Sequence, residues 1–232
     1  MATRRLPDAF QAELTMLPVT GILASISPTA NSGFITSSDT VYLTSRSGSN
    51  LSLSTADPMY LGGIVDISSN YIMYQIFLEF NINIPTNAII YAAELSMEAV
   101  VPTTEPFIVK ASIYNYGTLT SSSWVPGASL LPGTQVGQTY VLQNQGFSGE
   151  NTRGTSFDNV DSLRNSITPN STLKIMLSTS SMEKTSADFS FASNRYTKIT
   201  KSSIKLNINY VTAGELIAAL IGAYWGIKVT IQ

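Results

Sequence analysis

YIMYQIFLEFNINIPTNAIIYAAELSMEAVV, residues 71–101, contains the strongest structural signal in the chain. Two long runs of alternating residues flank the turn PTNA, Pro85–Ala88. One side of the first run is apolar and comprises Ile72, Tyr74, Ile76, Leu78, Phe80, Ile82 and Ile84, opposite Gln75, Glu79, Asn81 and Asn83. One side of the second run comprises Ile89, Tyr91, Ala93, Leu95, Met97, Ala99 and Val101, opposite Glu94, Ser96 and Glu98. A period of two predicts a hairpin of two strands, each with one buried and one wet face.

Outside this stretch, further alternating runs predict one antiparallel jelly-roll β-sandwich over residues 34–211. These runs are residues 40–46, 59–67, 107–116, 138–143, 172–180, 186–193 and 202–211. Gly62 and Gly63 interrupt one of them and predict a bulge or a close approach of two backbones. A short helix is expected within Phe157–Ile167, and a long Ser-, Gly- and Pro-rich loop within Gly117–Gly137. The fold class is therefore all-β.

The composition limits the possible functions. The chain has 232 residues, a net charge of -2, and 12% charged residues, about half the usual share. Its wet faces must rely on Ser, Thr and Asn, which offer no electrostatic attraction for nucleic acid. It contains neither cysteine nor histidine, which excludes disulfides, thiolate metal sites and every histidine-dependent catalytic site. We expect no enzyme activity, no cofactor, no metal and no nucleic-acid partner.

The first 33 residues are predicted to be an N-terminal arm, because their apolar residues follow no clean period. Three of them are candidate assembly contacts: Leu17, Ile22 and Leu23. A basic start followed by an apolar patch is faintly typical of a signal peptide, but Pro7, Asp8 and Glu13 interrupt it. No run of 18 apolar residues is present, so we expect no membrane insertion.

Residues 212–232 are predicted to form a short helix, Ala213–Gly226, followed by a terminal strand. The helix carries apolar residues at helical spacing, and four of them are candidate assembly contacts: Leu216, Leu220, Tyr224 and Trp225. Its apolar face needs a cover. Docking against the chain's own sheet and contact with another subunit both satisfy that need.

The order of these features resembles the DNRLRE-type domain, a carbohydrate-binding-module-like jelly roll found in secreted and cell-surface proteins. The matching phrases are IFLEFNINIPTNAIIYAAELSM (residues 76–97), DNVDSLRNSI (158–167), FSFASNRY (189–196) and KSSIKLNINY (201–210). The resemblance spans residues 38–211. It departs from the family at Asn81, where an Asp is usual, and around Trp124, where a longer tryptophan-containing phrase is usual. The resemblance implies a jelly-roll module without implying a particular ligand.

Three aromatic residues beside the long loop are candidates for ligand binding: Tyr114, Tyr116 and Trp124. Aromatic rings on an outward face can stack on sugar rings. The alternative is that the loop folds over them and buries them, as aromatic side chains usually prefer.

Acidic residues supply two further candidate sites. Glu94 and Glu98 lie on one wet strand face, and a carboxylate pair is what an inverting glycosidase uses. Ordinary polar alternation accounts for them equally well. Asp57, Asp66, Asp158 and Asp161 can contribute to a calcium site, although a DxDxDG-type loop is absent.

Three function classes remain. The first is a non-enzymatic virion structural protein of a bacteriophage, on the capsid, collar or tail, which assembles with copies of itself and other virion proteins. Its basis is the Ser-, Thr- and Asn-rich surface, the missing Cys, His and signal peptide, and the two apolar extensions. The second is a carbohydrate-binding or adhesin module on a receptor-binding fibre or a cell surface, with glycans as partners. The third, a hydrolase that uses carboxylates alone, ranks far behind.

Overall fold

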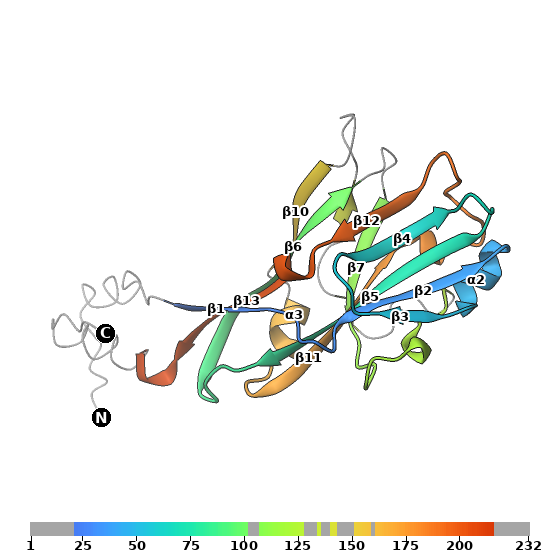
Figure 1. Ribbon diagram of the computed structural model, residues 1–232. Helices are drawn as coiled ribbons and strands as arrows, with labels where there is room; N and C mark the ends of the chain where they lie inside the picture. The colour runs from blue at the N-terminus through green and yellow to red at the C-terminus, as the bar shows by residue number, and fades with distance from the viewer. Residues whose placement is uncertain are drawn as a thin grey trace, which may run out of the picture.

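The computed structural model describes residues 21–101, 107–127, 134–135, 140–142, 151–158 and 161–215. Within these ranges thirteen strands form one continuous antiparallel sheet (Figure 1). The strands are β1 (Ile22–Ile26), β2 (Gly33–Asp39), β3 (Ser52–Ser54), β4 (Met59–Val65), β5 (Tyr71–Ile82), β6 (Ala88–Val101), β7 (Phe107–Ile113), β8 (Thr134–Gln135), β9 (Tyr140–Leu142), β10 (Asn151–Asp158), β11 (Ser171–Thr179), β12 (Arg195–Ile199) and β13 (Lys205–Thr212). The helices are α2 (Tyr42–Gly48) and α3 (Asp161–Ser166), with 3₁₀ turns η1 (Ser121–Ser123), η3 (Ser180–Glu183) and η4 (Lys201–Ser203).

The sheet folds back on itself into two layers. One layer has the order β10–β6–β13–β1. The other contains β3, β2, β5, β11 and β7, with β8 and β9 on the far edge of β7. Strands β4 and β12 join the layers, because β12 pairs with β6 on one side and with β4 on the other. Successive long strands alternate between the layers, and the predicted all-β antiparallel sandwich is confirmed.

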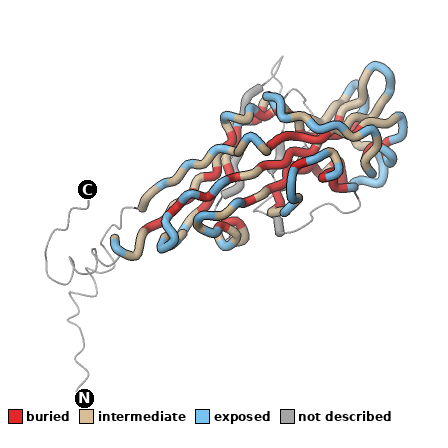
Figure 2. Tube along the Cα trace, turned by 60° about the horizontal axis from the view of Figure 1, so that its bottom comes forward, coloured by how far each residue is buried: buried red, intermediate tan, exposed pale blue. Residues whose placement is uncertain are grey.

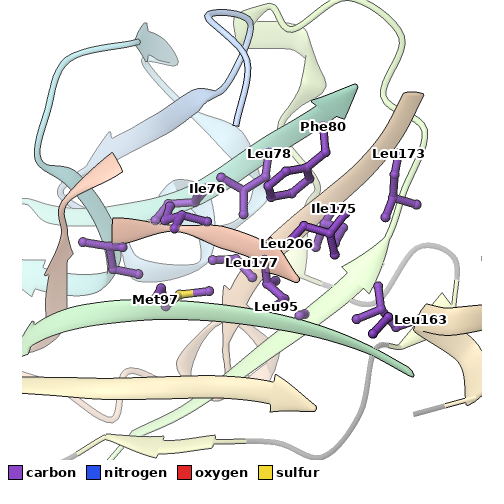
Figure 3. Packing of buried hydrophobic residues seen from close by; sticks show 14 of the residues in the cluster. Ile76, Leu78, Phe80, Leu95, Met97, Leu163, Leu173, Ile175, Leu177 and Leu206 are labelled. Carbon is purple, nitrogen blue, oxygen red and sulfur yellow. The ribbon is translucent and has the colours of Figure 1, made fainter. Parts of the chain in front are cut away.

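Strands β5 and β6 do not form the hairpin that the sequence predicted. Within the described chain, β5 pairs with β2, β4 and β11, whereas β6 pairs with β10, β12 and β13. The turn between them is closed by the Ala88 amide, which donates to the Pro85 carbonyl at 3.0 Å. The two strands face each other across the main core (Figure 3). Alternation fixes which face of each strand is buried, but it leaves open whether the strands lie side by side or one above the other.

The main core lies between the layers and is built from the inward residues of the long strands (Figure 3). It includes Ile76, Leu78, Phe80 and Ile82 of β5, Leu95 and Met97 of β6, Leu173, Ile175 and Leu177 of β11, and Leu206 and Ile208 of β13. Leu163 of α3 closes one side of it. Buried positions run along the strands through the body, and exposed positions gather at the turns (Figure 2). The predicted inward residues of residues 76–82 and 93–99 are confirmed.

A second core covers the opposite face of β5. It consists of Ile35, Tyr42, Met73, Phe77, Leu119, Trp124, Val125, Met176, Met182 and Phe189. Gln75, predicted to lie on a wet face, is fully buried on the same side. The prediction of one wet face is therefore wrong for the first half of β5. Met73 and Phe77 interrupt the polar side, and other segments of the chain bury them in the second core.

Residues 40–46 were predicted to be a strand, but residues 42–48 form α2. Tyr42 and Ser45 are its buried residues. Their spacing of three is helical, and it lets both side chains face the sheet from one side of the helix.

Other differences concern short or weakly patterned segments. Residues 186–193 form turns with one isolated bridge, Ser190 to Ser193, instead of the expected strand. Six strands were not predicted as strands: β1, β2, β3, β8, β10 and β12. Strand β1, which lies within the residues assigned to the arm, therefore belongs to the sandwich. The expected helix in residues 157–167 is present as α3, although it begins at Asp161.

Candidate functional site

Trp124 lies in the second core rather than on the surface. Its side chain is only 6% exposed, and its Nε1 donates a hydrogen bond to the Arg46 carbonyl at 3.3 Å. Gly48 lies against the indole, because a Cβ on Gly48 would stand 2.7 Å from Trp124 Cδ1. The indole is thus covered by α2 and buried in the second core, so the prediction that Trp124 stacks on a ligand is wrong.

Tyr114 and Tyr116 follow β7 and are half-buried against the second core. Tyr116 meets Phe77 edge-on, with 5.2 Å between ring centroids, and Lys174 Nζ lies 5.0 Å above its ring. Burial raises the pKa of Tyr116, and the nearby Glu79 charge raises it further. The structure therefore brings the two tyrosines together, at 6.4 Å, with both half-buried against the second core, and their role in ligand binding stays a prediction.

Glu79 holds the connection between β1 and β2 against β5. Its carboxylate accepts hydrogen bonds from Thr29 Oγ1 at 2.9 Å and from Asn31 Nδ2 at 2.8 Å, and it pairs with Lys174 Nζ at 3.4 Å. Burial alone would raise the pKa of Glu79, but these hydrogen bonds and the lysine charge outweigh burial and hold it below its ordinary value. The cluster is an internal clamp.

The predicted assembly contacts fall into two groups. Ile22 packs against the main core, so it belongs to the sandwich. Leu23, its neighbour in β1, points outward and is 60% exposed. The other five, Leu17, Leu216, Leu220, Tyr224 and Trp225, lie outside the described residues.

A β-bulge in β6 turns the side chains of two residues to the outward face, beside Leu23. Asn209 pairs with Ala92 and Tyr210 pairs with Ile90, so Tyr91 is the extra residue. The bulge reverses the alternation, so that Ile90 faces the core while Ile89 and Tyr91 are each 47% exposed. The prediction that Ile89 and Tyr91 face inward is therefore wrong. We call the outward residues Leu23, Ile89 and Tyr91 the terminal surface.

Both ends of the described chain lie at the terminal surface. Strand β1 begins at Ile22, which pairs with Tyr210 near the end of β13 (Figure 1). A Cβ on Gly21 would stand 1.7 Å from Tyr91 Oη, so Tyr91 reaches across β13 to the residue before β1. After β13, residues 213–215 begin a helix. Thr212 and Glu215 cap it reciprocally: the Thr212 amide donates to Glu215 Oε2 at 2.7 Å, and the Glu215 amide donates to Thr212 Oγ1 at 3.3 Å. The start of the predicted C-terminal helix is present, and its remainder lies outside the described residues.

A second surface feature is a cluster of three tyrosines from neighbouring strands: Tyr60 of β4, Tyr74 of β5 and Tyr196 of β12. The ring centroids of Tyr60 and Tyr74 are 5.4 Å apart, and those of Tyr60 and Tyr196 are 6.4 Å apart with planes inclined by 21°. All three residues are half-buried, and Tyr60 and Tyr74 pack against the main core. Buried Phe34 lies 5.5 Å from Tyr60 and 6.2 Å from Tyr74. We call Tyr60, Tyr74 and Tyr196 the tyrosine surface.

Gly62 lies between two of the three tyrosines in the sheet. It pairs with Tyr74 on one side and with Tyr196 on the other. Its φ of +113° and the 2.2 Å between its hypothetical Cβ and the Arg195 carbonyl oxygen show that β4 and β12 approach closely here. The predicted close approach at Gly62 is confirmed. Sequence reasoning missed the three tyrosines because strand β12 was not predicted, although a glycine pair inside a strand was the available signal.

The carboxylate sites predicted from sequence find no support in the geometry. Glu94 and Glu98 are four residues apart on β6, which places their Cα atoms about 13 Å apart, beyond the roughly 6.5–9.5 Å between the carboxyl groups of an inverting pair. Asp57 accepts a hydrogen bond from the Lys201 amide, and Asp66 accepts them from Ser68 and Asn70 within its own turn. Among the described residues no three acidic side chains cluster as metal ligands, and no helix there is long and apolar enough to cross a membrane.

Comparison with known proteins gives only distant structural likenesses. No protein-family model matches the chain, and no curated protein matches it. The K1 cleaved adhesin domain of Lys-gingipain from Porphyromonas gingivalis is similar over 81% of this chain and 98% of that domain, at 10% identity and a TM-score of 0.36. The empty top component of cowpea mosaic virus is similar over 83% of this chain and 84% of that one, at 8% identity and a TM-score of 0.21. Both TM-scores are too low to inform the function, and the DNRLRE-type resemblance stays a prediction.

Proposed function

We propose that this protein is a non-enzymatic structural subunit of a bacteriophage virion, on the capsid, collar or tail, that is anchored through its terminal surface. One observation carries the proposal. The chain enters and leaves the sheet at paired positions, Ile22 and Tyr210, beside the exposed side chains of Leu23, Ile89 and Tyr91. Both terminal extensions therefore begin next to an apolar patch on the same end of the sandwich.

The chemistry of the patch and of the extensions agrees with an anchoring role. Exposed apolar side chains that cluster on a sheet gain free energy when another surface covers them. The segments 1–20 and 216–232 supply apolar side chains of their own, including Leu17, Leu220 and Trp225. The body, in contrast, has few charges and many hydroxyl and amide side chains. The partners we propose are copies of this chain and other virion proteins, and the location is the virion.

The test compares the full chain with two deletions, Δ1–20 and Δ216–232, by light scattering on a size-exclusion column. Neither deletion removes a described strand, so both variants are expected to keep the far-UV spectrum and cooperative unfolding of the full chain. We expect the full chain to self-associate and both deletions to be monomeric. A third deletion, Δ1–26, removes β1 and exposes Ile208 and Tyr210 of the core, so its melting temperature should fall.

Two outcomes contradict the proposal. One is a full chain that stays monomeric at the highest soluble concentration and is absent, by mass spectrometry, from virions purified from its source culture. The other is loss of cooperative unfolding in both Δ1–20 and Δ216–232, which would make the extensions part of the core. A double variant, Leu23→Ser with Ile89→Ser, distinguishes an anchoring role from a role in the core, because it changes only exposed side chains.

The alternative is a carbohydrate-binding or adhesin module on a receptor-binding fibre or a cell surface. A specific observation favours it as a second candidate, namely the tyrosine surface around Gly62. The two roles are compatible, because an anchored subunit can present a binding surface elsewhere on the same sandwich.

A further inference from the structure

Strand β1 is the outermost strand of its layer and has one open edge. One side of β1 pairs with β13 along all of its residues, and within the described chain no strand pairs with the other side (Figure 1). The backbone N–H and C=O groups of an open edge can pair with a further strand, so native proteins usually protect edges with charges, prolines or bulges. The sequence of β1, ILASI, contains no charge and no proline, and its register with β13 is regular.

The other edges of the described sheet are charged or short. Strand β10 pairs with β6 on one side only, and it carries Arg153 and Asp158. Strands β3 and β9 have three residues each, and β8 has two. Among the described strands, β1 therefore offers the edge that is best suited to bind another strand.

The side chains of β1 are arranged symmetrically about Ala24 on the inward face. Ile22, Ala24 and Ile26 pack against the main core but are only partly buried there. An antiparallel second copy of β1, centred on Ala24, would place Ile22 opposite Ile26 of the partner subunit and Ala24 opposite its own copy. A register shifted by one residue would turn the two inward faces to opposite sides of the sheet. The register centred on Ala24 keeps both faces aligned and pairs all five residues.

The outward face fits the same register. Leu23 is 60% exposed, and its neighbour on this face, Ser25, is exposed as well. In the symmetric pair each Leu23 lies opposite Ser25 of the partner subunit, and the two copies of Leu23 become diagonal neighbours about 7–8 Å apart, within reach of each other. No like charges meet, because β1 carries none. A second β1 thus covers the exposed leucine and extends the core at the same time.

We propose that two copies of this chain pair antiparallel through β1, about a two-fold axis at Ala24, so that the sheet continues from one subunit into the other. The inference rests on the proposed anchoring at the terminal surface, for which it names the partner and the geometry. Five paired residues bury less area than a stable interface needs. The terminal extensions therefore supply the rest of the contact, and β1 sets its symmetry. A two-fold contact of this kind closes after two copies.

Disulfide trapping in the full chain tests the register. The chain contains no cysteine, so a single introduced cysteine can pair only with its own copy in another subunit. Opposed Cα atoms of an antiparallel pair are about 4.5–5.5 Å apart, which suits a disulfide. Ala24→Cys should therefore form a covalent dimer on mild oxidation. Tyr91→Cys is the matched control, because this exposed residue lies on β6, and the two β6 strands would be five strand spacings, about 24 Å, apart.

Charge variants at Leu23 provide a second measurement, by light scattering. Leu23→Lys places two like charges on the diagonal and removes apolar burial, so it should raise the dissociation constant of the dimer at least tenfold. An equal mixture of Leu23→Lys and Leu23→Glu should recover association, because the diagonal then carries opposite charges. Thermal unfolding of each variant should match that of the full chain, since the changed side chain is exposed.

Three results overturn the pairing and leave the anchoring proposal intact. The first is a full chain that self-associates while Ala24→Cys stays unlinked, which would place another segment, such as residues 227–232, on the β1 edge. The second is faster linking of Tyr91→Cys than of Ala24→Cys, which would place two terminal surfaces face to face. The third is a mixture of the Leu23 charge variants that associates no better than either variant alone.

A monomeric full chain gives a fourth result. Monomers at the highest soluble concentration overturn the pairing through β1. They contradict the anchoring proposal as well only if the chain is also absent from purified virions. The two proposals therefore fail on different observations.

Discussion

Gln75 shows how one side chain can substitute for a strand. Its Nε2 donates to the Val125 carbonyl at 2.7 Å, and its Oε1 accepts from the Val125 amide at 3.0 Å. The side chain therefore pairs with a loop backbone as a neighbouring strand would, inside the second core. These two bonds hold the segment that carries Trp124 against β5.

The first prediction concerns this pairing. Gln75→Leu should lower the free energy of unfolding by about 1–3 kcal/mol for each of the two Val125 groups left without a partner. Asn83→Leu, an exposed change on the same run of sequence, should stay within about 0.5 kcal/mol. Urea denaturation of both variants measures the difference. Equal stability of the two variants would show that the Val125 bonds contribute nothing.

The second prediction concerns Glu79 and pH. The pKa of Glu79 is below its ordinary value of 4.5 in the folded protein. Its carboxylate therefore stabilises the fold above pH 4.5, and this stabilisation is lost as the pH falls through the folded-state pKa. At pH 7 Glu79→Gln should cost about 1–3 kcal/mol, and the difference from the unaltered protein should shrink as the pH approaches 3.

Urea denaturation across pH 3–7 provides the measurement for Glu79. Glu98→Gln is the matched control, because the Glu98 carboxylate makes no hydrogen bond within the described residues and its removal should change little at any pH. A difference between Glu79→Gln and the unaltered protein that stays constant down to pH 3 would show that the clamp does not depend on charge.

At the scale of elements, β4 owes its course to its two glycines. Gly62 lets the β12 backbone approach, and Gly63 leaves room for the Phe189 ring, which a Cβ would meet at 2.5 Å. Gly62 thus allows the close pairing at the junction of the two layers, and Gly63 allows Phe189 to pack in the second core. A bulky residue at either position would separate β4 from a neighbour.

The third prediction compares two glycines with positive φ. Gly62→Ala must bear both its φ of +113° and the contact with the Arg195 carbonyl oxygen, whereas Gly117, at φ +68°, has open space around it. Gly117→Ala should cost about 1–2 kcal/mol, from the backbone conformation alone. Gly62→Ala should cost at least about 3 kcal/mol. Thermal denaturation of the two variants ranks them, and the reverse order would refute the close approach.

The elements also show where sequence reasoning stops. Strict alternation identified β5, β6, β11 and β13, because long half-buried strands leave a period of two. It failed at Tyr91, where one extra residue reverses the faces, and no single sequence reveals a bulge that depends on the partner strand β13. It failed at α2 because a short helix and a short strand both accept the sequence VYLTSR. The helix is the form observed, and in it Tyr42 is buried in the second core by tertiary contacts.

For the whole molecule, the sequence predicted the antiparallel sandwich but not which distant segments meet in it. Trp124 is a core residue, in line with the alternative that the loop folds over it, but its cover by α2 was not predicted. The tyrosine surface combines residues 60, 74 and 196, which only the β4–β12 junction brings together. Contacts between segments so distant in sequence leave no periodic signal in any one of them.

The antiparallel pairing of β1 with β13 also has a mechanical consequence. If the two chain ends are pulled apart from each other, the load falls on the terminal pair Ile22–Tyr210 and then on each next pair in turn, so that the ladder unzips at low force. If both ends are held together and the body is pulled away from them, β1 and β13 are loaded side by side in the same direction, so the hydrogen bonds between them are not opened one after another. A protein attached in this way would withstand traction on its body far better than separation of its own ends.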